Sequence, residues 1–182
     1  APAAGAEMAK AMEAMSRAAA SAQSAAVNPV NFRVLREMLP ATAAGLPRRS
    51  LEGQTQMGVS QAQARYADET EKRSIQIALT DSGSMRGVLA TGAAFMLNTE
   101  MDQETEKGME RTTSWYGYRL YEKQEGAHSE VKVLVADRFF VEITGKGLSL
   151  EMLRKVLDEL PLKKLEAMKN EGAQAGQNSP GK

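Results

Sequence analysis

The sequence predicts an α+β protein in which helices pack on an antiparallel β-sheet of about six to eight strands. Apolar and polar residues alternate with period two through most of residues 51–147, as in half-buried strands. Helical spacing precedes and follows this region, and no β-α-β alternation indicates a parallel sheet. The chain of 182 residues, 42% hydrophobic and 25% charged, has the composition of a soluble domain.

The first 27 residues are rich in alanine, which predicts a helical extension before the domain. Met8, Met12 and Met15 are spaced by four and three residues, so they share one face of that helix. Pro29 ends it, because the residue before proline disfavours the α region. A second short helix is expected in residues 31–39, with Asn31 as its N-cap.

Eight segments have strand patterning, and the clearest pair forms a hairpin in residues 129–147 around an Asp137-Arg138 turn. Alternate residues of both halves are Val, Ile or Phe, so the hairpin is expected to build the core. The segments are 51–58, 60–67, 72–80, 98–106, 109–116, 118–123, 129–135 and 139–147. A helix is expected between the third and fourth, in residues 84–97.

Two helices are predicted to follow the strands. The first covers residues 150–160 with Ser149 as its N-cap, and the second covers 162–169 after Pro161. The last residues are polar and are expected to be disordered. The predicted organisation is therefore a helical extension (1–27), a single domain (28–169) and a polar tail (170–182).

Composition excludes several classes of function. Basic and acidic residues balance at 23 each, so no global field favours nucleic acid. The chain has no cysteine and one histidine, His128, which leaves no ligand set for zinc and no basis for a histidine triad. No cofactor is expected, and no apolar run approaches the roughly 20 residues of a transmembrane helix.

Asp81 is the leading candidate for catalysis, because Asp81-Ser82-Gly83 matches the D-[ST]-G pattern of aspartic proteases. That chemistry needs two carboxylates that share a proton, and the chain has one copy of the motif. The other interpretation is a turn in which Asp81 or Ser82 caps the next helix.

Two surfaces are candidates for binding. Trp115, Tyr116, Tyr118 and Tyr121 concentrate aromatic rings that could form a platform for a ligand or partner, or could pack in the core. The methionine face of residues 8–15 could pack on its own domain or dock a partner helix, since methionine adapts to varied contacts. An acidic stripe in residues 100–106 is either a solvated edge or a weak cation site.

Most of the chain, from about residue 7 to 169, resembles an uncharacterised family of small bacterial proteins that are secreted or periplasmic. The similar segments include EMAKAME, NPVNFRVLREMLP, RYADETEKRSIQIALTDSG, ETEKGMERTTSWYGYRLYEK, DRFFVEI and LPLKKLEAMK. In outline the implied fold is similar to the PsbP-like α/β sandwich, by analogy of fold alone. The resemblance implies no activity and no catalytic residue.

The sequence therefore favours a non-catalytic, extracytoplasmic module that binds a protein partner or a small ligand. The start APAAG, without an initiator methionine, is typical of a mature secreted chain and also of any trimmed chain, so a cytoplasmic location stays open. The alternatives are a carboxylate-dependent hydrolase that uses Asp81 and a purely structural envelope protein.

Overall fold

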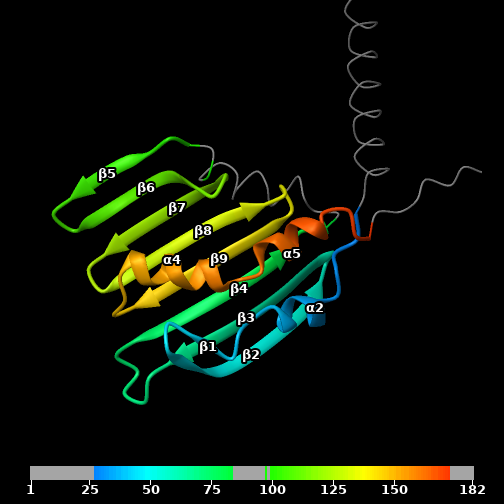
Figure 1. Cartoon of the computed structure of the whole chain (residues 1–182), viewed down its shortest axis with the longest axis horizontal. Helices are drawn as coiled ribbons and strands as arrows, with labels where there is room; N and C mark the ends of the chain where they lie inside the picture. Colours follow the sequence, from blue (N-terminus) through cyan, green and yellow to red (C-terminus); the bar gives the residue numbers. More distant parts are fainter. Residues whose placement is uncertain (1–26, 84–96, 98, 173–182) are drawn as a thin grey trace, which may run out of the picture.

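The computed structural model describes residues 27–83, 97 and 99–172. In this part of the chain nine strands form one antiparallel sheet in the order β1-β2-β3-β4-β9-β8-β7-β6-β5 (Figure 1). The strands are β1 (Thr42–Ala43), β2 (Leu46–Gln56), β3 (Val59–Ala67), β4 (Ser74–Asp81), β5 (Asp102–Thr105), β6 (Gly108–Trp115), β7 (Tyr118–Glu125), β8 (His128–Val135) and β9 (Phe139–Lys146).

The α+β class and the antiparallel sheet are confirmed, but the prediction of six to eight strands was too low. The additional strand, β1, has two residues that pair with Leu46 and Pro47, and such a short ladder leaves no alternation to detect. Strand β2 begins at Leu46, five residues before the predicted start. The prediction missed its first half because Pro47, two arginines and an irregularity between Arg48 and Ser50 interrupt the alternating pattern there.

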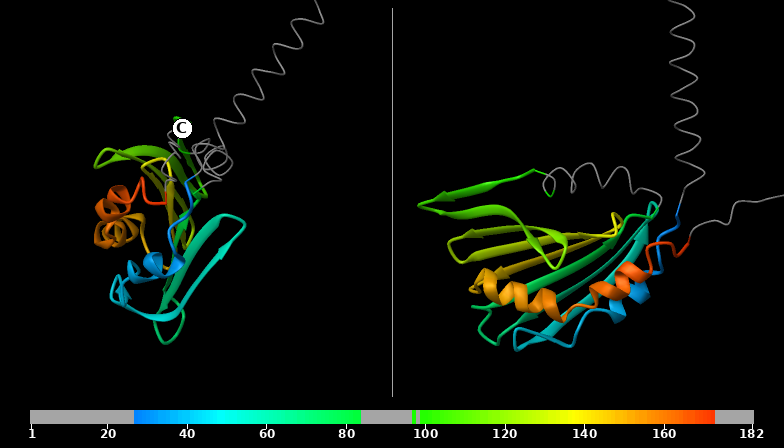
Figure 2. Two further views of the ribbon diagram at one scale, coloured as in Figure 1. Left: turned by 90° about the vertical axis from the view of Figure 1, so that its right-hand side faces the viewer. Right: turned by 45° about the horizontal axis from the view of Figure 1, so that its top comes forward.

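Three helices in the described part of the chain lie on one side of the sheet (Figure 2). They are α2 (Phe32–Glu37), α4 (Leu150–Glu159) and α5 (Leu162–Ala167). The predicted N-caps are confirmed, since Asn31 accepts a hydrogen bond from the backbone N–H of Arg33, and Ser149 from that of Met152. Pro161 directly precedes α5, where its missing N–H costs nothing.

The core lies between the sheet and the helices. Alternate residues of β4, β8 and β9 face the helices and are buried, as the alternating pattern of the 129–147 hairpin predicted. The buried residues of this wall include Ile75, Ile77, Leu79, Val131, Val133, Val135, Phe139, Val141 and Ile143. Leu153, Val156 and Leu157 of α4 cover it.

Glycines in two strands let the helices approach the sheet closely. A Cβ on Gly53 of β2 would lie 2.6 Å from Cδ2 of Phe32 in α2, and one on Gly145 of β9 would lie 2.7 Å from Cδ1 of Leu153 in α4. Both distances are too short for real contacts, so a side chain at either position would displace the helix residue that packs there.

Several predicted features lie outside the described residues. They are the helix in 1–27 with Met8, Met12 and Met15, the helix in 84–97 apart from Leu97, and residues 173–182 of the tail. The described chain continues through Asn170 to Gly172, whose carbonyl accepts a hydrogen bond from the N–H of Asn28 at 3.0 Å. The first and last described segments therefore meet at one end of the sheet (Figure 1).

Candidate functional site

Asp81, the candidate catalytic residue, is buried in an ion pair with Arg138. The carboxylate is 0% exposed and the arginine 1% exposed. Arg138 donates from Nε to Oδ1 at 2.8 Å and from Nη2 to Oδ2 at 2.7 Å. The backbone N–H groups of Val30 and Gly83 donate to the same carboxylate, at 2.7 and 2.9 Å. Four donors thus occupy both oxygens, which leaves the carboxylate no contact with solvent or substrate.

The remaining donors of Arg138 bind backbone carbonyls from the two ends of the described chain. Nη2 donates to Asn28 at 3.1 Å, and Nη1 donates to Met168, Lys169 and Glu171 at 3.1, 3.1 and 2.7 Å. The Asp81–Arg138 pair therefore joins the end of β4, the β8–β9 turn and both terminal segments. Its geometry supports a structural role, and the helix that Asp81 was expected to cap lies beyond the described residues.

A second buried carboxylate, Glu122 of β7, was missed in the sequence. It accepts hydrogen bonds from Nε of Arg111 at 3.0 Å, from Nη2 of Arg154 at 2.6 Å and also from Nε of Arg154. Burial alone would raise the pKa of Glu122, but the hydrogen bonds and charges of the two arginines outweigh it and lower the pKa. Since Glu122 follows Leu120 by two residues, the alternation of β7 could have shown that it faces the core.

The histidine and the acidic stripe form no metal site among the described residues. His128 is the exposed first residue of β8. Strand β5 contains only four residues of the predicted strand, all of them exposed, and Glu106 lies in the turn that follows. This arrangement is that of a solvated edge strand.

Three of the four aromatic candidates meet at the turn between β6 and β7. Tyr116 and Gly117 form this two-residue turn with φ of 46° and 84°, the left-handed conformation of a type I′ hairpin. Tyrosine rarely adopts it, and here the ring is 77% exposed. Partly buried Trp115 meets the Tyr116 ring edge to face, with centroids 4.6 Å apart. The turn thus presents an aromatic side chain at a cost in backbone energy.

These rings form one wall of a hollow of about 450 Å³, here called the aromatic notch. The opposite wall is the corner between α4 and α5, with lining residues Leu157, Asp158, Leu160, Pro161, Leu162 and Lys163. Only Asp158 and Lys163 of the lining carry charge. The sequence signal for this wall is Pro161 between two helical segments, which places apolar residues at a sharp corner.

Tyr118 is fixed in the notch by a hydrogen bond from its hydroxyl to Oε2 of Glu166 in α5, at 3.0 Å. Burial and the neighbouring Glu166 raise the pKa of Tyr118, so the phenol stays protonated and continues to donate. Lys163 Nζ lies 5.9 Å from the centre of the same ring. The ring therefore has a defined position between β7 and α5 before any ligand binds.

Tyr121 lies apart from the other three aromatic residues. An odd spacing of three from Tyr118 places it on the opposite face of β7, where it is buried. Its hydroxyl donates to Oε1 of Glu110 at 2.7 Å, and burial together with Glu110 raises the pKa of Tyr121 strongly. The predicted aromatic surface therefore reduces to Trp115, Tyr116 and Tyr118.

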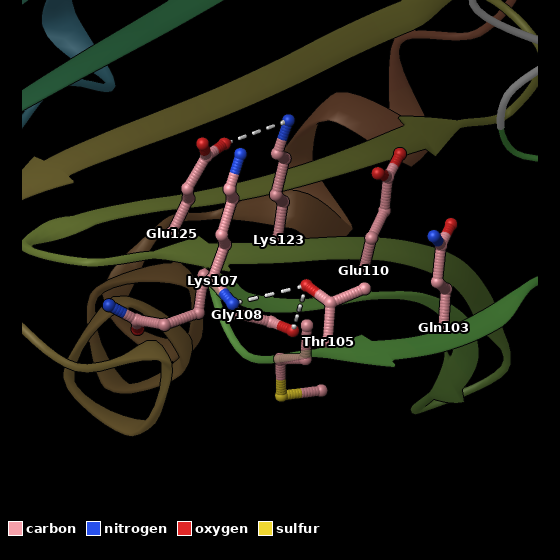
Figure 3. Close-up of a pocket in the computed structure, with 9 residues that line it drawn as sticks. Gln103, Thr105, Lys107, Gly108, Glu110, Lys123 and Glu125 are labelled. Atoms are coloured by element: carbon pink, nitrogen blue, oxygen red, sulfur yellow. Dashed lines mark hydrogen bonds and ion pairs between the residues drawn. The ribbon is translucent and has the colours of Figure 1, made fainter.

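Two other hollows lie near the strand ends opposite the β6–β7 turn. One of about 150 Å³ lies along β5, β6 and β7 (Figure 3), and several of its polar groups pair with each other. Lys123 pairs with Glu125 at 3.4 Å, and Thr105 accepts from the N–H of Lys107 at 3.3 Å. A larger one of about 800 Å³ includes His128 in a lining of polar, charged and small residues, without Trp, Tyr or Phe. Neither matches the aromatic notch in apolar side chains.

Comparison of the chain with protein-family models, with curated proteins and with solved structures found no match. Among the described residues, no helix is long and apolar enough to cross a membrane. The assignment of function depends on the geometry of the described residues.

Proposed function

We propose that the protein is a non-catalytic binding module whose ligand occupies the aromatic notch. The observation that carries the proposal is Tyr116, an exposed ring that the turn holds in a conformation unfavourable for tyrosine, beside partly buried Trp115 and Tyr118. Backbone strain clusters at functional sites. Met57 shares this strain and exposure, and what distinguishes Tyr116 is its place beside two further aromatic rings at the notch.

The size and lining of the notch define the class of ligand. A volume of about 450 Å³ is within the range of small-molecule pockets. Aromatic and aliphatic walls with single charges at Asp158 and Lys163 favour a planar or apolar group with few polar atoms. A small aromatic ligand has this character, and so does an apolar side chain of a protein partner.

The alternatives lead to different expectations. A hydrolase that uses Asp81 would need a carboxylate oxygen open to substrate, and burial beneath Arg138 gives that hypothesis no support. A purely structural envelope protein would have no ligand in the notch, so it predicts a negative result in the binding experiment.

Trp115 makes the experiment direct, because it is the single tryptophan of the chain and lines the notch. Small aromatic and heteroaromatic compounds are titrated into the protein while the fluorescence emission of Trp115 is followed. A compound in the notch is expected to shift the emission saturably. The Tyr116→Ala variant is expected to bind about tenfold more weakly, since aromatic anchors dominate binding energies.

Met57→Ala is the matched control. Met57 occupies the same position in the β2–β3 turn, with φ of 51° before Gly58, and is 82% exposed. Binding to this variant should equal that of the unchanged chain. If no compound produces a saturable shift, or if Tyr116→Ala binds as tightly as Met57→Ala, the notch is not the site.

The proposal also includes a location outside the cytoplasm and a docking role for Met8, Met12 and Met15. The location is supported by the resemblance to secreted or periplasmic proteins, and fractionation of cells that express the protein from its own gene tests it.

The docking role is tested by a cross-linked pull-down that compares the whole chain with one beginning at Asn28. A partner captured equally by both chains would exclude the methionine face as the docking element.

A further inference from the structure

A hollow of about 610 Å³ lies between α2 and the β1–β2 region, on the opposite half of the sheet from the aromatic notch. We call it the arginine hollow. Its lining consists of three arginines, one acidic residue and four apolar residues: Arg33, Arg36, Arg48, Glu37, Leu39, Pro40, Ala41 and Leu51. Because five strands separate β1 and β2 from β6, this hollow is independent of the proposed function.

The three arginines differ from most others in the described part of the chain. Five arginines there form ion pairs with carboxylates: Arg65, Arg73, Arg111, Arg138 and Arg154. No carboxylate of the described residues pairs with Arg33, Arg36 or Arg48, although Glu37 lies on the same lining. The lining is therefore net positive, with guanidinium groups available to an anion.

Arg48 is held in place by hydrogen bonds to the backbone. Arg48 donates from Nη1 to the carbonyls of Leu39 and Pro40, at 3.0 and 3.2 Å. The carbonyl of Pro40 also accepts from the hydroxyl of Tyr66 at 2.8 Å, which fixes this segment to β3. A guanidinium positioned before binding loses less conformational entropy when an anion arrives.

Arg36 carries a buried donor without a partner. Its stem packs over β2, where a Cβ on Gly53 would lie 2.8 Å from Cδ of Arg36. Its Nε is shielded from solvent and makes no hydrogen bond. This nitrogen is out of reach of a ligand oxygen as it is of water, so Arg36 contributes to the hollow through its charge.

The rest of the lining is apolar. Leu39 is buried, Leu51 and Pro40 are partly buried, and all three border the same space as the guanidinium groups. Inorganic phosphate would leave this part of a hollow of about 610 Å³ unfilled. We propose that the arginine hollow binds a small anionic amphiphile, with a phosphate or carboxylate head at the arginines and a short apolar chain against Leu39, Pro40 and Leu51.

The experiment titrates the whole chain by calorimetry with octyl phosphate, octanoate, octanol and inorganic phosphate. The two anionic amphiphiles are kept below their micellar concentrations and octanol below its solubility limit. Octyl phosphate or octanoate is expected to bind at one site, about tenfold or more tightly than octanol and inorganic phosphate, because both parts of the ligand contribute. The better of the two anions identifies the head group. Equal affinity for octanol would overturn the role of the arginines, and equal affinity for inorganic phosphate would overturn the apolar part.

The variant that tests the site is Arg33→Gln together with Arg36→Gln, which leaves the Arg48 contacts to Leu39 and Pro40 intact. The double variant is expected to bind the amphiphile at least about tenfold more weakly, as expected for the loss of charge-assisted hydrogen bonds. Arg65→Gln removes a charge on the opposite face of the sheet, where Arg65 pairs with Glu71, and should bind as the unchanged chain does. Thermal unfolding confirms that each variant is folded. Unchanged affinity in the folded double variant, or no saturable binding of either anion to the unchanged chain, would exclude the site.

Discussion

At the scale of single residues, we expect the buried pair of Asp81 and Arg138 to contribute strongly to the free energy of unfolding. Its two partners lie 57 positions apart in the chain, and both are removed from water. Removing one charge leaves the other buried and uncompensated, which typically costs about 3–5 kcal/mol. We expect Asp81→Asn to lower the free energy of unfolding by that amount, measured by urea denaturation.

The control for this prediction is Glu71→Gln, which breaks the solvent-exposed pair with Arg65 and should change the unfolding midpoint little. The same experiment separates two interpretations of Asp81. A hydrolase would lose its activity in Asp81→Asn while keeping its stability. An Asp81→Asn protein as stable as the Glu71→Gln protein would contradict the structural role.

Glu122 gives the protein a predictable response to acid. The pKa of Glu122 is lowered in the folded state, so its contribution to stability is present above the ordinary glutamate value of 4.5 and is lost as pH falls through the folded pKa. We expect Glu122→Gln to be less stable at neutral pH but to lose less stability than the unchanged chain between about pH 6 and about pH 3. Urea denaturation at several pH values measures this slope, and parallel profiles for the two proteins would count against the prediction.

The partners of buried polar residues could not be predicted from the sequence. Arg138 follows Asp137 in the segment ADRFF, which reads as a charged, solvated turn. In the structure only Asp137 is exposed, while Arg138 turns inward to a carboxylate that the sequence cannot place beside it. Alternation shows that a residue faces inward, as at Glu122, but not which partner it meets there.

At the scale of elements, the two hairpin turns Met57-Gly58 and Tyr116-Gly117 invite a direct comparison. Both place a large residue at a positive φ, which costs roughly 1–2 kcal/mol relative to glycine and less with asparagine. We expect Met57→Asn and Tyr116→Asn each to raise the free energy of unfolding by about 0.5–1 kcal/mol. Only Tyr116→Asn should also lose binding at the aromatic notch. Thermal unfolding and the tryptophan titration measure the two effects, and a destabilised Tyr116→Asn protein would mean that the ring serves packing.

Most of the elements could be predicted because their cause is local. The strong alternation in 129–147 and the caps at Asn31 and Ser149 each depend on residues close together in the chain. Strand β1 and the first half of β2 could not be predicted, because pairing rather than alternation defines them. The aromatic residues of the notch could be singled out in the sequence, but the hollow itself could not, because the α4–α5 corner that faces them comes from residues about 40 positions later.

At the scale of the whole molecule, Arg138 makes the two terminal segments interdependent. It donates to carbonyls of Asn28 and of residues 168–171, while Asn28 donates to Gly172. A chain that ends at Ala167 loses three acceptors for Nη1 and the buried side chain of Met168. We expect a loss of about 3 kcal/mol or more of unfolding free energy, measured by urea denaturation.

A chain that ends at Gly172 keeps every one of these described contacts and serves as the control. It should unfold at nearly the same urea concentration as the whole chain. If both shortened chains unfold at the same urea concentration, the C-terminal carbonyls contribute little, and the stability of the Arg138 site comes from Asp81 and the carbonyl of Asn28.

The dependence of Arg138 on residues 168–171 also bears on biosynthesis. A ribosome completes the β8–β9 hairpin at Lys146, more than twenty residues before it adds the carbonyls that accept hydrogen bonds from Arg138 in the turn. During that interval the guanidinium of Arg138 has its carboxylate partner but lacks its last acceptors, and water takes their place. The set of hydrogen bonds around Arg138 is therefore complete only after Glu171 has been added to the chain.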